Sequence, residues 1–380
     1  MEREGSRCSA VALTIARRCA RSSAVSGPER VLVAMSGGVD SSVAAALLRE
    51  QGHTLVGVTL HLWDATGESK VGRCCAPEDR DDARRTCEAL DIPHYVIDER
   101  EAFRTEVVDP FLDAYRGGTT PSPCVACNQY VKLGRLAQLA DQLGCTKIAT
   151  GHYARVELDP TGPVLLRGAD ASKDQSYFLY GVPSSILARL VLPLGGMTKD
   201  RTRDEGRRLG VPNWAKKDSQ ELCFVPDGDI GGFVEREAGA GTAGRIVDET
   251  GAVLAAHDGV QRFTIGQRKG LGLAGPAPDG KPRYVLRIVR ETGDVIVGGE
   301  DGLRADALTA RHVTWIGDAP REAFEAEVQI RHRHAASPAR VEPTADGFVA
   351  RFASPQRAVA PGQAAVVYVG PRVVGGGTIA

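Results

Sequence analysis

The sequence predicts an α/β protein with a doubly wound parallel sheet, followed by a small mixed central domain and a C-terminal antiparallel β-barrel. Apolar runs alternate with helical segments from Arg30 onward, which is the pattern of βαβ units. After Pro282, short strand-like runs recur between Gly, Pro and Asp turns, a pattern typical of a small barrel. A chain of 380 residues also has room for two or three domains of about 150 residues each.

The first βαβ unit is expected to consist of VLVAM, a helix from Val43 to Gln51 that Gly52 ends, and TLVGVTLHLW. The carboxyl ends of such parallel strands are where doubly wound sheets bind their ligands. We expect one sheet domain over residues 30–196. The alternation continues with a helix over 78–90, a strand over 94–98, helices over 101–115 and 128–144, and a strand over 147–152.

The remaining segments are expected to form two further domains and a disordered extension over residues 1–29. The central domain, residues 197–281, should hold a helix from Arg201 to Leu209, a polar loop, and a helix around Phe233. The barrel, residues 282–380, should be built from the runs YVLRIV, DVIVGG, EAEVQI, ARVEP, FVARF and AAVVYVG.

Composition excludes several classes of protein. Hydrophobic residues make up 42% and charged residues 25% of the chain, as in a globular protein. No run of about 18 apolar residues is present, so no membrane span is expected. The 47 basic and 48 acidic side chains nearly cancel, so a nucleic-acid site would have to be a local basic patch. Nine scattered cysteines do not form a disulfide scaffold and favour a reducing, cytoplasmic location.

The run Ser36-Gly37-Gly38-Val39-Asp40-Ser41-Ser42 lies between the first strand and its helix, where backbone N–H groups and the helix dipole attract an anion. Two glycines let the chain approach phosphate closely. The run lacks the lysine of a Walker A loop, so pyrophosphate fits it better than a transferring γ-phosphate. It resembles the signature of the PP-loop ATP pyrophosphatases, which cleave ATP between the α and β phosphates and adenylate a substrate oxygen.

Two cysteines lie in sequence surroundings that are typical of reactive thiols. Cys127 follows a Gly/Thr/Pro loop and is expected at the start of a helix, where the dipole lowers the pKa of a thiol. Cys223 lies in the loop Ser219-Gln220-Glu221-Leu222-Cys223-Phe224 and not in an apolar stripe. Cys87 and Cys145 are expected to be core residues, and Cys8, Cys19 and the pair Cys74-Cys75 are given no role.

Together these features resemble the tRNA-specific 2-thiouridylases, in which a Cys before Asn and a distant Cys before Phe form the catalytic pair. The resemblance extends over nearly the whole chain. Further matching motifs are ATGHYAR (149–155), KDQSYFL (173–179) and FTIGQRKGLG (263–272), together with Pro361-Gly362-Gln363.

The resemblance implies an ATP-dependent tRNA-uridine 2-sulfurtransferase. Cys223 would receive a persulfide sulfur, Cys127 would be the partner nucleophile, and turnover would leave a disulfide between them. This agrees with the chemistry, because replacing the C2 oxygen of uridine needs an activated leaving group and a soft sulfur nucleophile. ATP, accompanied by Mg²⁺, would contact Ala34, Met35, Ser36, Gly37, Gly38, Val39, Asp40, Ser41, Leu60 and Gly151.

The resemblance also implies tRNA as substrate and a cysteine desulfurase or sulfur-carrier protein as sulfur donor. The basic run Arg331-His332-Arg333-His334 would supply phosphate contacts at the barrel rim. His152 follows a strand end, where a site residue is expected. The residues expected to contact tRNA are Ser122, Pro123, Cys124, His152, Lys173, Asp174, Gln175, Arg331, His332 and Gln363.

Cys124 departs from the family pattern, because many members carry an Asp there that is proposed to assist proton transfer. Cys124, Cys127 and Cys223 together could instead ligate three irons of a [4Fe-4S] cluster and leave one iron open for sulfide. The cluster-free persulfide route and the cluster route both remain open. A structural zinc at the C-x-x-C pair lacks an obvious fourth ligand.

Two further functions fit parts of the pattern. One is a different PP-loop reaction, such as ATP-dependent amide or argininosuccinate formation, which would not require Cys127 and Cys223. The other is a non-enzymatic module that binds nucleotide or RNA.

Overall fold

The computed structural model describes residues 27–64, 77–217, 222–225, 228–239, 241–273 and 280–380. The expected extension over 1–29 lies almost entirely outside these residues, as do Cys8, Cys19, Cys74 and Cys75. No helix in these ranges combines the length and the apolar character needed to cross a membrane.

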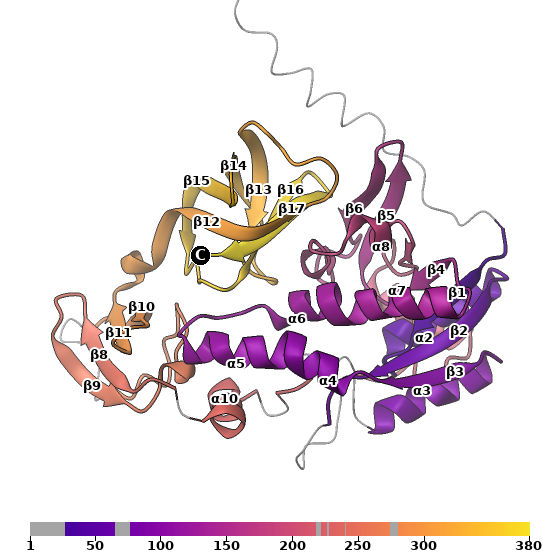
Figure 1. Cartoon of the computed structure of the whole chain (residues 1–380), viewed down its shortest axis with the longest axis horizontal. Helices are drawn as coiled ribbons and strands as arrows, with labels where there is room; N and C mark the ends of the chain where they lie inside the picture. The colour runs from indigo at the N-terminus through magenta and orange to yellow at the C-terminus, as the bar shows by residue number, and fades with distance from the viewer. Residues whose placement is uncertain (1–26, 65–76, 218–221, 226–227, 240, 274–279) are drawn as a thin grey trace, which may run out of the picture.

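A parallel sheet with helices on both faces confirms the predicted fold class (Figure 1). Its strand order is β3-β2-β1-β4-β7, and every neighbouring pair is parallel. The order reverses direction between β1 and β4, which creates a crevice at their carboxyl ends. The strands are β1 (Arg30–Ala34), β2 (Thr54–His61), β3 (His94–Asp98), β4 (Lys147–Ala149) and β7 (Leu190–Val191).

The apolar strands are buried from both sides, as a parallel sheet requires. One face packs against α7 (Leu133–Gln142), whose Leu133, Leu136 and Leu139 contact Leu32 and Val56 in one core cluster. The other face packs against α2 (Val39–Glu50) and α3 (Pro77–Ala89) through Val31, Val33 and Leu48.

Two long helices contain π-helical segments. The first runs from α4 (Arg100–Phe103) through a π segment, η1 (Arg104–Val108), into α5 (Asp109–Arg116). Pro110 lacks a donor N–H and its ring would clash with an upstream carbonyl, so the wider turn before it relieves the helix. The second runs from α6 (Pro123–Ala126) through η2 (Cys127–Lys132) into α7.

This second helix corrects the expectation that Cys127 begins a helix. The helix starts at Pro123, because proline is well suited to a first helical position, where its missing N–H has no intrahelical partner to lose. Cys127 therefore lies one turn inside, and Cys124 occupies the first turn. The field of the helix dipole falls off within the first turn, so Cys127 lies beyond the position where that effect was expected.

The middle of the chain contains α9 (Lys199–Arg208) and α10 (Ile230–Ala238), close to where helices were expected. They are followed by a four-stranded sheet of order β10-β11-β8-β9. Its strands are β8 (Gly244–Asp248), β9 (Val253–His257), β10 (Tyr284–Val289) and β11 (Asp294–Gly298). The runs YVLRIV and DVIVGG were expected in the barrel, but β11 pairs with β8, so both strands belong to this central sheet.

The C-terminal strands close into an antiparallel barrel because β12 pairs with both β15 and β17. Its strands are β12 (Arg304–Trp315), β13 (Phe324–Gln329), β14 (Ser337–Thr344), β15 (Gly347–Arg357), β16 (Ala364–Val369) and β17 (Arg372–Ile379). We propose that the barrel domain begins at β12, after the short helix Glu300–Leu303.

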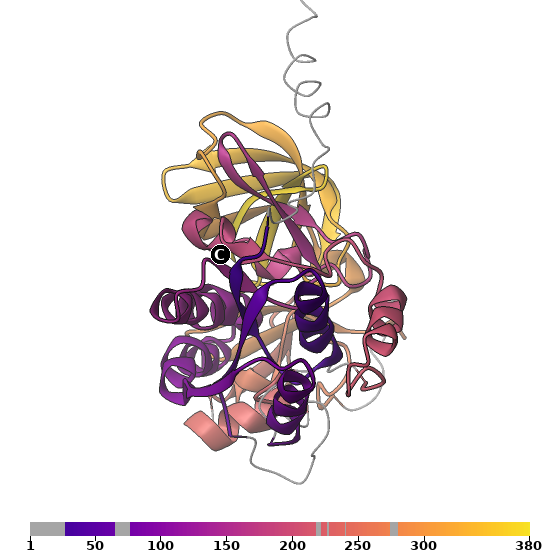
Figure 2. The ribbon, with the colours of Figure 1, turned by 90° about the vertical axis from the view of Figure 1, so that its right-hand side faces the viewer.

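A hairpin in the middle of the sheet domain joins the barrel, which sequence patterning did not anticipate. It consists of β5 (Ala154–Asp159) and β6 (Gly162–Arg167), and β6 extends the barrel sheet beside β17. Both views show the barrel and this hairpin on the same side of the parallel sheet (Figure 2). Tyr177, Val366 and Tyr368 lie in the same core cluster as the α7 face, so the two domains share one hydrophobic core.

Candidate functional site

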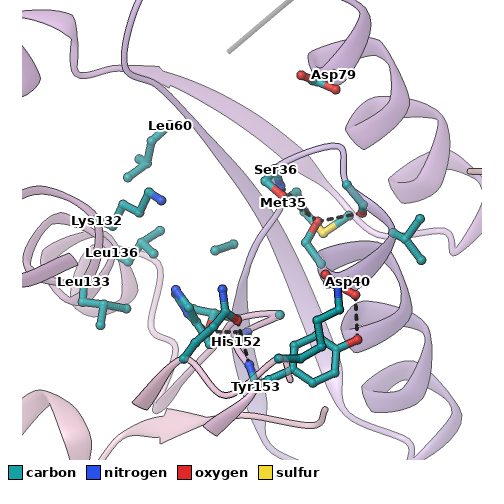
Figure 3. A pocket seen from close by; sticks show the side chains of 18 of the residues that line it. Met35, Ser36, Asp40, Leu60, Asp79, Lys132, Leu133, Leu136, His152 and Tyr153 are labelled. Carbon is teal, nitrogen blue, oxygen red and sulfur yellow. Dashed lines mark hydrogen bonds between the residues drawn. The ribbon is translucent and has the colours of Figure 1, made fainter. Parts of the chain in front are cut away.

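A cavity of about 370 Å³ opens at the reversal point of the parallel sheet. The loop after β1 forms one wall and the residues after β4 form another, while η2 and α7 face them across the space (Figure 3). Of the ten residues expected to contact ATP, Gly37 alone is absent from the cavity wall. The others line it: Ala34, Met35, Ser36, Gly38, Val39, Asp40, Ser41, Leu60 and Gly151.

The phosphate loop, residues 36–42, is held by short-range hydrogen bonds. The Ser41 hydroxyl lies 3.1 Å from the Ser36 hydroxyl and donates to the Gly38 carbonyl at 3.1 Å. Gly37 has a φ of +73°, and a Cβ there would lie 1.9 Å from the Asp79 carbonyl oxygen. Gly151 is equally close-packed, because its Cβ would lie 2.7 Å from the Ser41 nitrogen at the start of α2. These two glycines let the backbone segments pack without side chains between them.

Asp40 is fixed by residues from distant parts of the chain. Its Oδ1 accepts from Lys199 Nζ at 2.7 Å and lies 2.9 Å from the Tyr153 hydroxyl. That hydroxyl is also 2.9 Å from Thr202 Oγ1 on α9. The carboxylate is thereby tied to the residues after β4 and to the first turn of α9, and its orientation at the cavity is fixed.

His152 is held in its neutral form. Burial, together with the nearby Lys132 ammonium, lowers the pKa of its imidazole to about 3. Its Nδ1 lies 2.8 Å from Thr150 Oγ1, which fixes the ring. At neutral pH the imidazole can therefore donate or accept hydrogen bonds in the cavity without carrying charge.

The cavity wall is electrically asymmetric. Among the described residues that line it, five side chains are cationic, whereas only Asp40 and Asp79 are anionic. Such an excess favours a polyanionic ligand such as a nucleotide triphosphate. The cations are Lys132, Lys173, Lys216, Lys217 and Arg333.

The other end of the cavity is apolar. Val58, Leu60 and Leu62 of β2 and its extension, together with Leu133 and Leu136 of α7, line this part. A site that combines an apolar wall with cations and free helix N–H groups suits a ligand that has a flat base and a phosphate chain.

The cysteine pair lies beside the cavity and not in its wall. Cys127 is 5% exposed within a hydrophobic cluster, and Cys223 packs against the same cluster. Phe224 is inside this cluster, with its ring 5.0 Å from that of Phe111. Leu62 belongs to the cluster and also lines the cavity, and Leu60 packs against the cluster and lines the cavity as well, so the two environments adjoin.

The described residues do not form a ready metal site. No group of three His, Cys, Asp or Glu side chains among them is close enough to hold an ion. Cys124 is exposed, whereas Cys127 is buried. Neither the three thiols expected for a [4Fe-4S] cluster nor the C-x-x-C pair expected for zinc belongs to such a group among these residues.

The two other cysteines in the described ranges are Cys87 and Cys145. Cys87 and Cys145 are buried in the sheet domain, which confirms that they are core residues. Burial raises the pKa of the Cys87 thiol to about 12. Such a thiol stays protonated and unreactive at neutral pH.

Four of the residues expected to contact tRNA line the cavity: His152, Lys173, Gln175 and His332. Gln175 Oε1 accepts from the Tyr153 N–H at 2.9 Å. Asp174 is turned inward, accepting from the Gly168 and Ser176 N–H groups at 2.9 and 3.0 Å. It therefore shapes a turn, and its neighbours are the ones that face the cavity.

Ser122 and Gln363 are in contact across the domain boundary. Gln363 Nε2 donates to the Thr120 and Pro121 carbonyls at 2.9 and 3.1 Å, and Ser122 Oγ accepts from the Ala364 N–H at 3.2 Å. The turn before β16 therefore anchors the loop that leads into Pro123 and Cys124.

Arg331 is exposed at the barrel rim, and one of its guanidinium N–H groups donates to the Ala358 carbonyl at 2.9 Å.

Several residues of the cavity were missed by sequence reasoning. Lys132 gave a usable signal, because it is one of only two cations, with Arg135, on the amphipathic helix predicted over residues 128–144. Tyr153 lay inside the quoted motif ATGHYAR (149–155) but was given no role. Lys216 and Lys217 carried no local signal, since only tertiary packing brings the segment after α9 to the cavity. Arg333 was expected at the barrel rim as part of the basic run, and the structure places it in the cavity wall.

The glycine-rich loop, the reversal point and the cationic cavity define a nucleotide-binding α/β protein of the PP-loop fold. Three family models divide the chain among them. A tRNA methyl transferase HUP domain matches residues 29–227, a tRNA methyl transferase PRC-barrel domain matches 231–299, and an aminomethyltransferase beta-barrel domain matches 305–379.

Curated relatives cover almost all of the sequence. A tRNA-specific 2-thiouridylase MnmA from Sorangium cellulosum is 51% identical over 358 residues, with 92% of each chain covered. One from Geotalea uraniireducens is 47% identical over 360 residues, covering 92% of this chain and 95% of the relative. The chain belongs to the family of tRNA-specific 2-thiouridylases, which are enzymes.

Solved structures are more distant. A 4-thiouridine synthetase in complex with RNA and ATP is 16% identical, with a TM-score of 0.34 over 55% of this chain and 50% of that one. An NMN synthetase from Francisella tularensis is 20% identical, with a TM-score of 0.29 over 49% of this chain and 63% of that one. We draw nothing from similarities at these scores.

Proposed function

We propose that this chain is an ATP-dependent sulfurtransferase that converts the wobble uridine of tRNA to 2-thiouridine, releasing AMP and pyrophosphate. One observation carries the proposal. The phosphate loop faces a cavity whose wall includes Leu62, and Leu62 also belongs to the cluster that contains Cys127 and contacts Cys223. The nucleotide chemistry and the sulfur chemistry would thus be neighbours.

ATP would bind with its phosphates on the loop from Ser36 to Ser42 and its base against the apolar wall. The first N–H groups of α2 have no intrahelical acceptor and would donate to the phosphates. Lys132 and Lys173 would add positive charge from the opposite side. The Asp40 carboxylate and the phosphates are the oxygen ligands that Mg²⁺ prefers, and the ion would neutralise charge on the leaving pyrophosphate.

The first chemical step would be adenylation of the uridine. The C2 oxygen would attack the α-phosphorus of ATP, and the bond to the bridging oxygen would break to release pyrophosphate. The new bond turns a poor leaving group into AMP. Neutral His152 is placed to hydrogen-bond the base or the phosphate during this step.

The second step would transfer sulfur. The terminal sulfur of a Cys223 persulfide would bond to C2, and AMP would leave with the former C2 oxygen. The Cys127 thiolate would then attack Cys223 Sγ, breaking the persulfide S–S bond and leaving its electron pair on the sulfur now attached to C2. The resulting Cys127–Cys223 disulfide would be reduced by an external thiol before the next cycle.

This route requires Cys127 to be uncovered, because its side chain is 5% exposed in the hydrophobic cluster. Sulfur would arrive from a cysteine desulfurase or a sulfur-carrier protein. The half-buried thiol of Cys223 is the better placed of the two to accept it. The tRNA would lie along Lys173, Gln175, Arg331 and His332, so that its anticodon reaches the cavity.

The test is a reconstituted reaction with unmodified tRNA transcript, ATP, cysteine and a cysteine desulfurase, in which nucleosides are measured by mass spectrometry and AMP by chromatography. We expect 2-thiouridine at the first anticodon position and AMP in equal amount. Cys127→Ser and Cys223→Ser should each abolish 2-thiouridine while ATP affinity changes less than twofold. Cys145→Ser, a core cysteine of the same domain, is the matched control.

Other outcomes would favour the other functions. If the double Cys127→Ser, Cys223→Ser variant still thiolated tRNA, the sulfur route would be wrong. ATP turnover to AMP without tRNA would point to a different PP-loop ligase. ATP binding with no turnover under any of these conditions would point to a non-enzymatic module.

A further inference from the structure

We propose that Asn213 and Lys216 are positioning residues that orient the peptide between Gly37 and Gly38, so that the Gly38 N–H faces the phosphates. The inference rests on the proposed binding of ATP at the phosphate loop. Both side chains come from the segment after α9, which is distant from the loop in sequence, and both reach the same backbone atom.

The contacts converge on the Gly37 carbonyl oxygen. Asn213 Nδ2 donates to it at 2.9 Å and Lys216 Nζ donates to it at 3.1 Å. Asn213 is 9% exposed and is absent from the cavity wall. Its side chain is therefore placed to act on the loop and not on a ligand.

The geometry of the peptide group links the hydrogen bonds on the Gly37 carbonyl to the direction of the Gly38 N–H. In a planar trans peptide the C=O and the following N–H point in opposite directions. The described residues contain no cis peptide. With the Gly37 carbonyl directed toward Asn213 and Lys216, the Gly38 N–H is directed away from them, and Gly38 lines the cavity whereas Gly37 does not.

The orientation of this peptide needs additional hydrogen bonds because two glycines follow each other. Gly37 and Gly38 can each adopt backbone conformations that other residues cannot. The peptide group between them can therefore rotate at little steric cost. A rotated peptide would turn its carbonyl oxygen toward the phosphates and replace an attractive dipole with a repulsive one. Two donors on the opposite side hold the carbonyl in the productive direction.

Lys216 is itself held in place. Its Nζ contacts the Asp79 carboxylate and lies 2.6 Å from Asp82 Oδ2, both at the start of α3. Burial opposes the charge of the ammonium, but the two carboxylates outweigh this and raise its pKa. The lysine stays protonated and directed at Gly37 at physiological pH.

The experiment compares the affinities of ATP and adenosine for the full-length protein by calorimetry. Asn213→Asp keeps the shape of the side chain and removes the donor, and Lys216→Met removes the second donor. We expect Asn213→Asp, whose side chain lies outside the cavity wall, to lose at least tenfold in ATP affinity while adenosine affinity changes less than twofold, because phosphate binding depends on the peptide. Lys216→Met should lose more, because it also removes a cation from the cavity wall. Arg85→Met is the matched control, since Arg85 also pairs with Asp82 but does not contact Gly37.

The outcomes separate the two proposals. An Asn213→Asp variant that binds ATP as tightly as the parent would overturn the inference and leave the proposed function intact. A parent protein that does not bind ATP would overturn both. Equal losses of affinity for ATP and adenosine would show that the side chain has a general structural role, and this result would also overturn the inference. A thermal melt of each variant identifies one that fails to fold, and Lys216→Arg, which restores a donor, should then recover ATP affinity.

Discussion

At the scale of single residues, the site depends on groups whose neighbours leave little freedom. Gly37 has a positive φ and no room for a Cβ, and His152 is kept neutral by burial and by Lys132. Both features follow from close packing around the cavity. Each can be tested by changing one side chain.

We expect Gly37→Ala to destabilise the fold by about 1–3 kcal/mol, because an L residue is strained at this φ and its Cβ would overlap the Asp79 carbonyl. The phosphate loop should move, and ATP affinity should fall at least tenfold. Urea denaturation and calorimetry measure the two effects. Gly38→Ala is the control for folding, since its Cβ would meet nothing closer than 3.5 Å; an equal loss of stability in both variants would contradict the argument.

His152 makes stability depend on pH. Its pKa is about 3 in the folded protein and ordinary, near 6.5, in the unfolded chain, so the unfolded state binds more protons between these values. Its stabilising contribution is therefore complete above pH 6.5 and decreases as the pH falls toward 3, by at most about 1.4 kcal/mol per pH unit.

The measurement is the free energy of unfolding in urea from pH 4 to pH 7. His152→Gln should show a shallower dependence on pH than the parent. His94 and His332 also have lowered pKa values, because both rings are partly buried. Part of the pH dependence of the free energy of unfolding will therefore remain in the His152→Gln variant. Identical slopes for parent and variant would mean that His152 is not buried in the neutral form.

At the scale of elements, the helix from Pro123 to Gln142 connects the cavity wall with the hydrophobic cluster that contains Cys127. Its π segment begins at Cys127, in the hydrophobic cluster, and ends at Lys132, in the cavity wall. Such π turns are uncommon and frequently occur at functional sites. A change at the nucleotide end of the segment can therefore reach the cysteine through one continuous element.

Lys132→Met should lower ATP affinity roughly tenfold to a hundredfold, equivalent to about 1.4–2.7 kcal/mol, since it removes a cation from the cavity wall. It should also raise the pKa of His152, because the Lys132 ammonium lowers it. Calorimetry and NMR titration of the imidazole measure these effects. Lys269→Met, at an exposed site away from the cavity, should change neither; an unchanged His152 pKa in Lys132→Met would count against the contact.

At the scale of the whole molecule, the barrel completes the cavity. His332 and Arg333 reach the cavity from the barrel, and Gln363 anchors the loop before Cys124. The shared hydrophobic core and the β5–β6 hairpin hold the barrel against the sheet domain. A change in the position of the barrel would therefore move side chains that line the cavity.

Arg331→Ala should weaken tRNA binding and make the dependence of log K on log salt shallower by about 1, as expected for the loss of one phosphate contact. ATP affinity should stay within twofold, because Arg331 does not line the cavity. Filter binding at several salt concentrations measures the slope. Arg340→Ala, another exposed barrel arginine, is the control; equal tRNA affinity in Arg331→Ala and the parent would remove this rim from the interface.

Much of the fold could be predicted because its signals are local. The parallel strands, their helices and the Ser36–Ser42 loop each show a period or a turn within a few residues. The strand over 94–98 was predicted with its observed bounds. The start of the helix at Pro123 was missed because a four-residue turn with Cys124 and Ala126 has no apolar period to reveal it.

The sequence by itself determined the class of the fold, the phosphate loop and the identity of the two candidate cysteines, since each depends on residues adjacent in the chain. Tertiary structure alone decided that β11 pairs with β8, that β6 joins the barrel, and that Lys132, Lys216 and Arg333 share one cavity. The reason is physical. Strand pairing and the convergence of distant side chains are set by how buried surfaces fit together, and no local pattern encodes that fit.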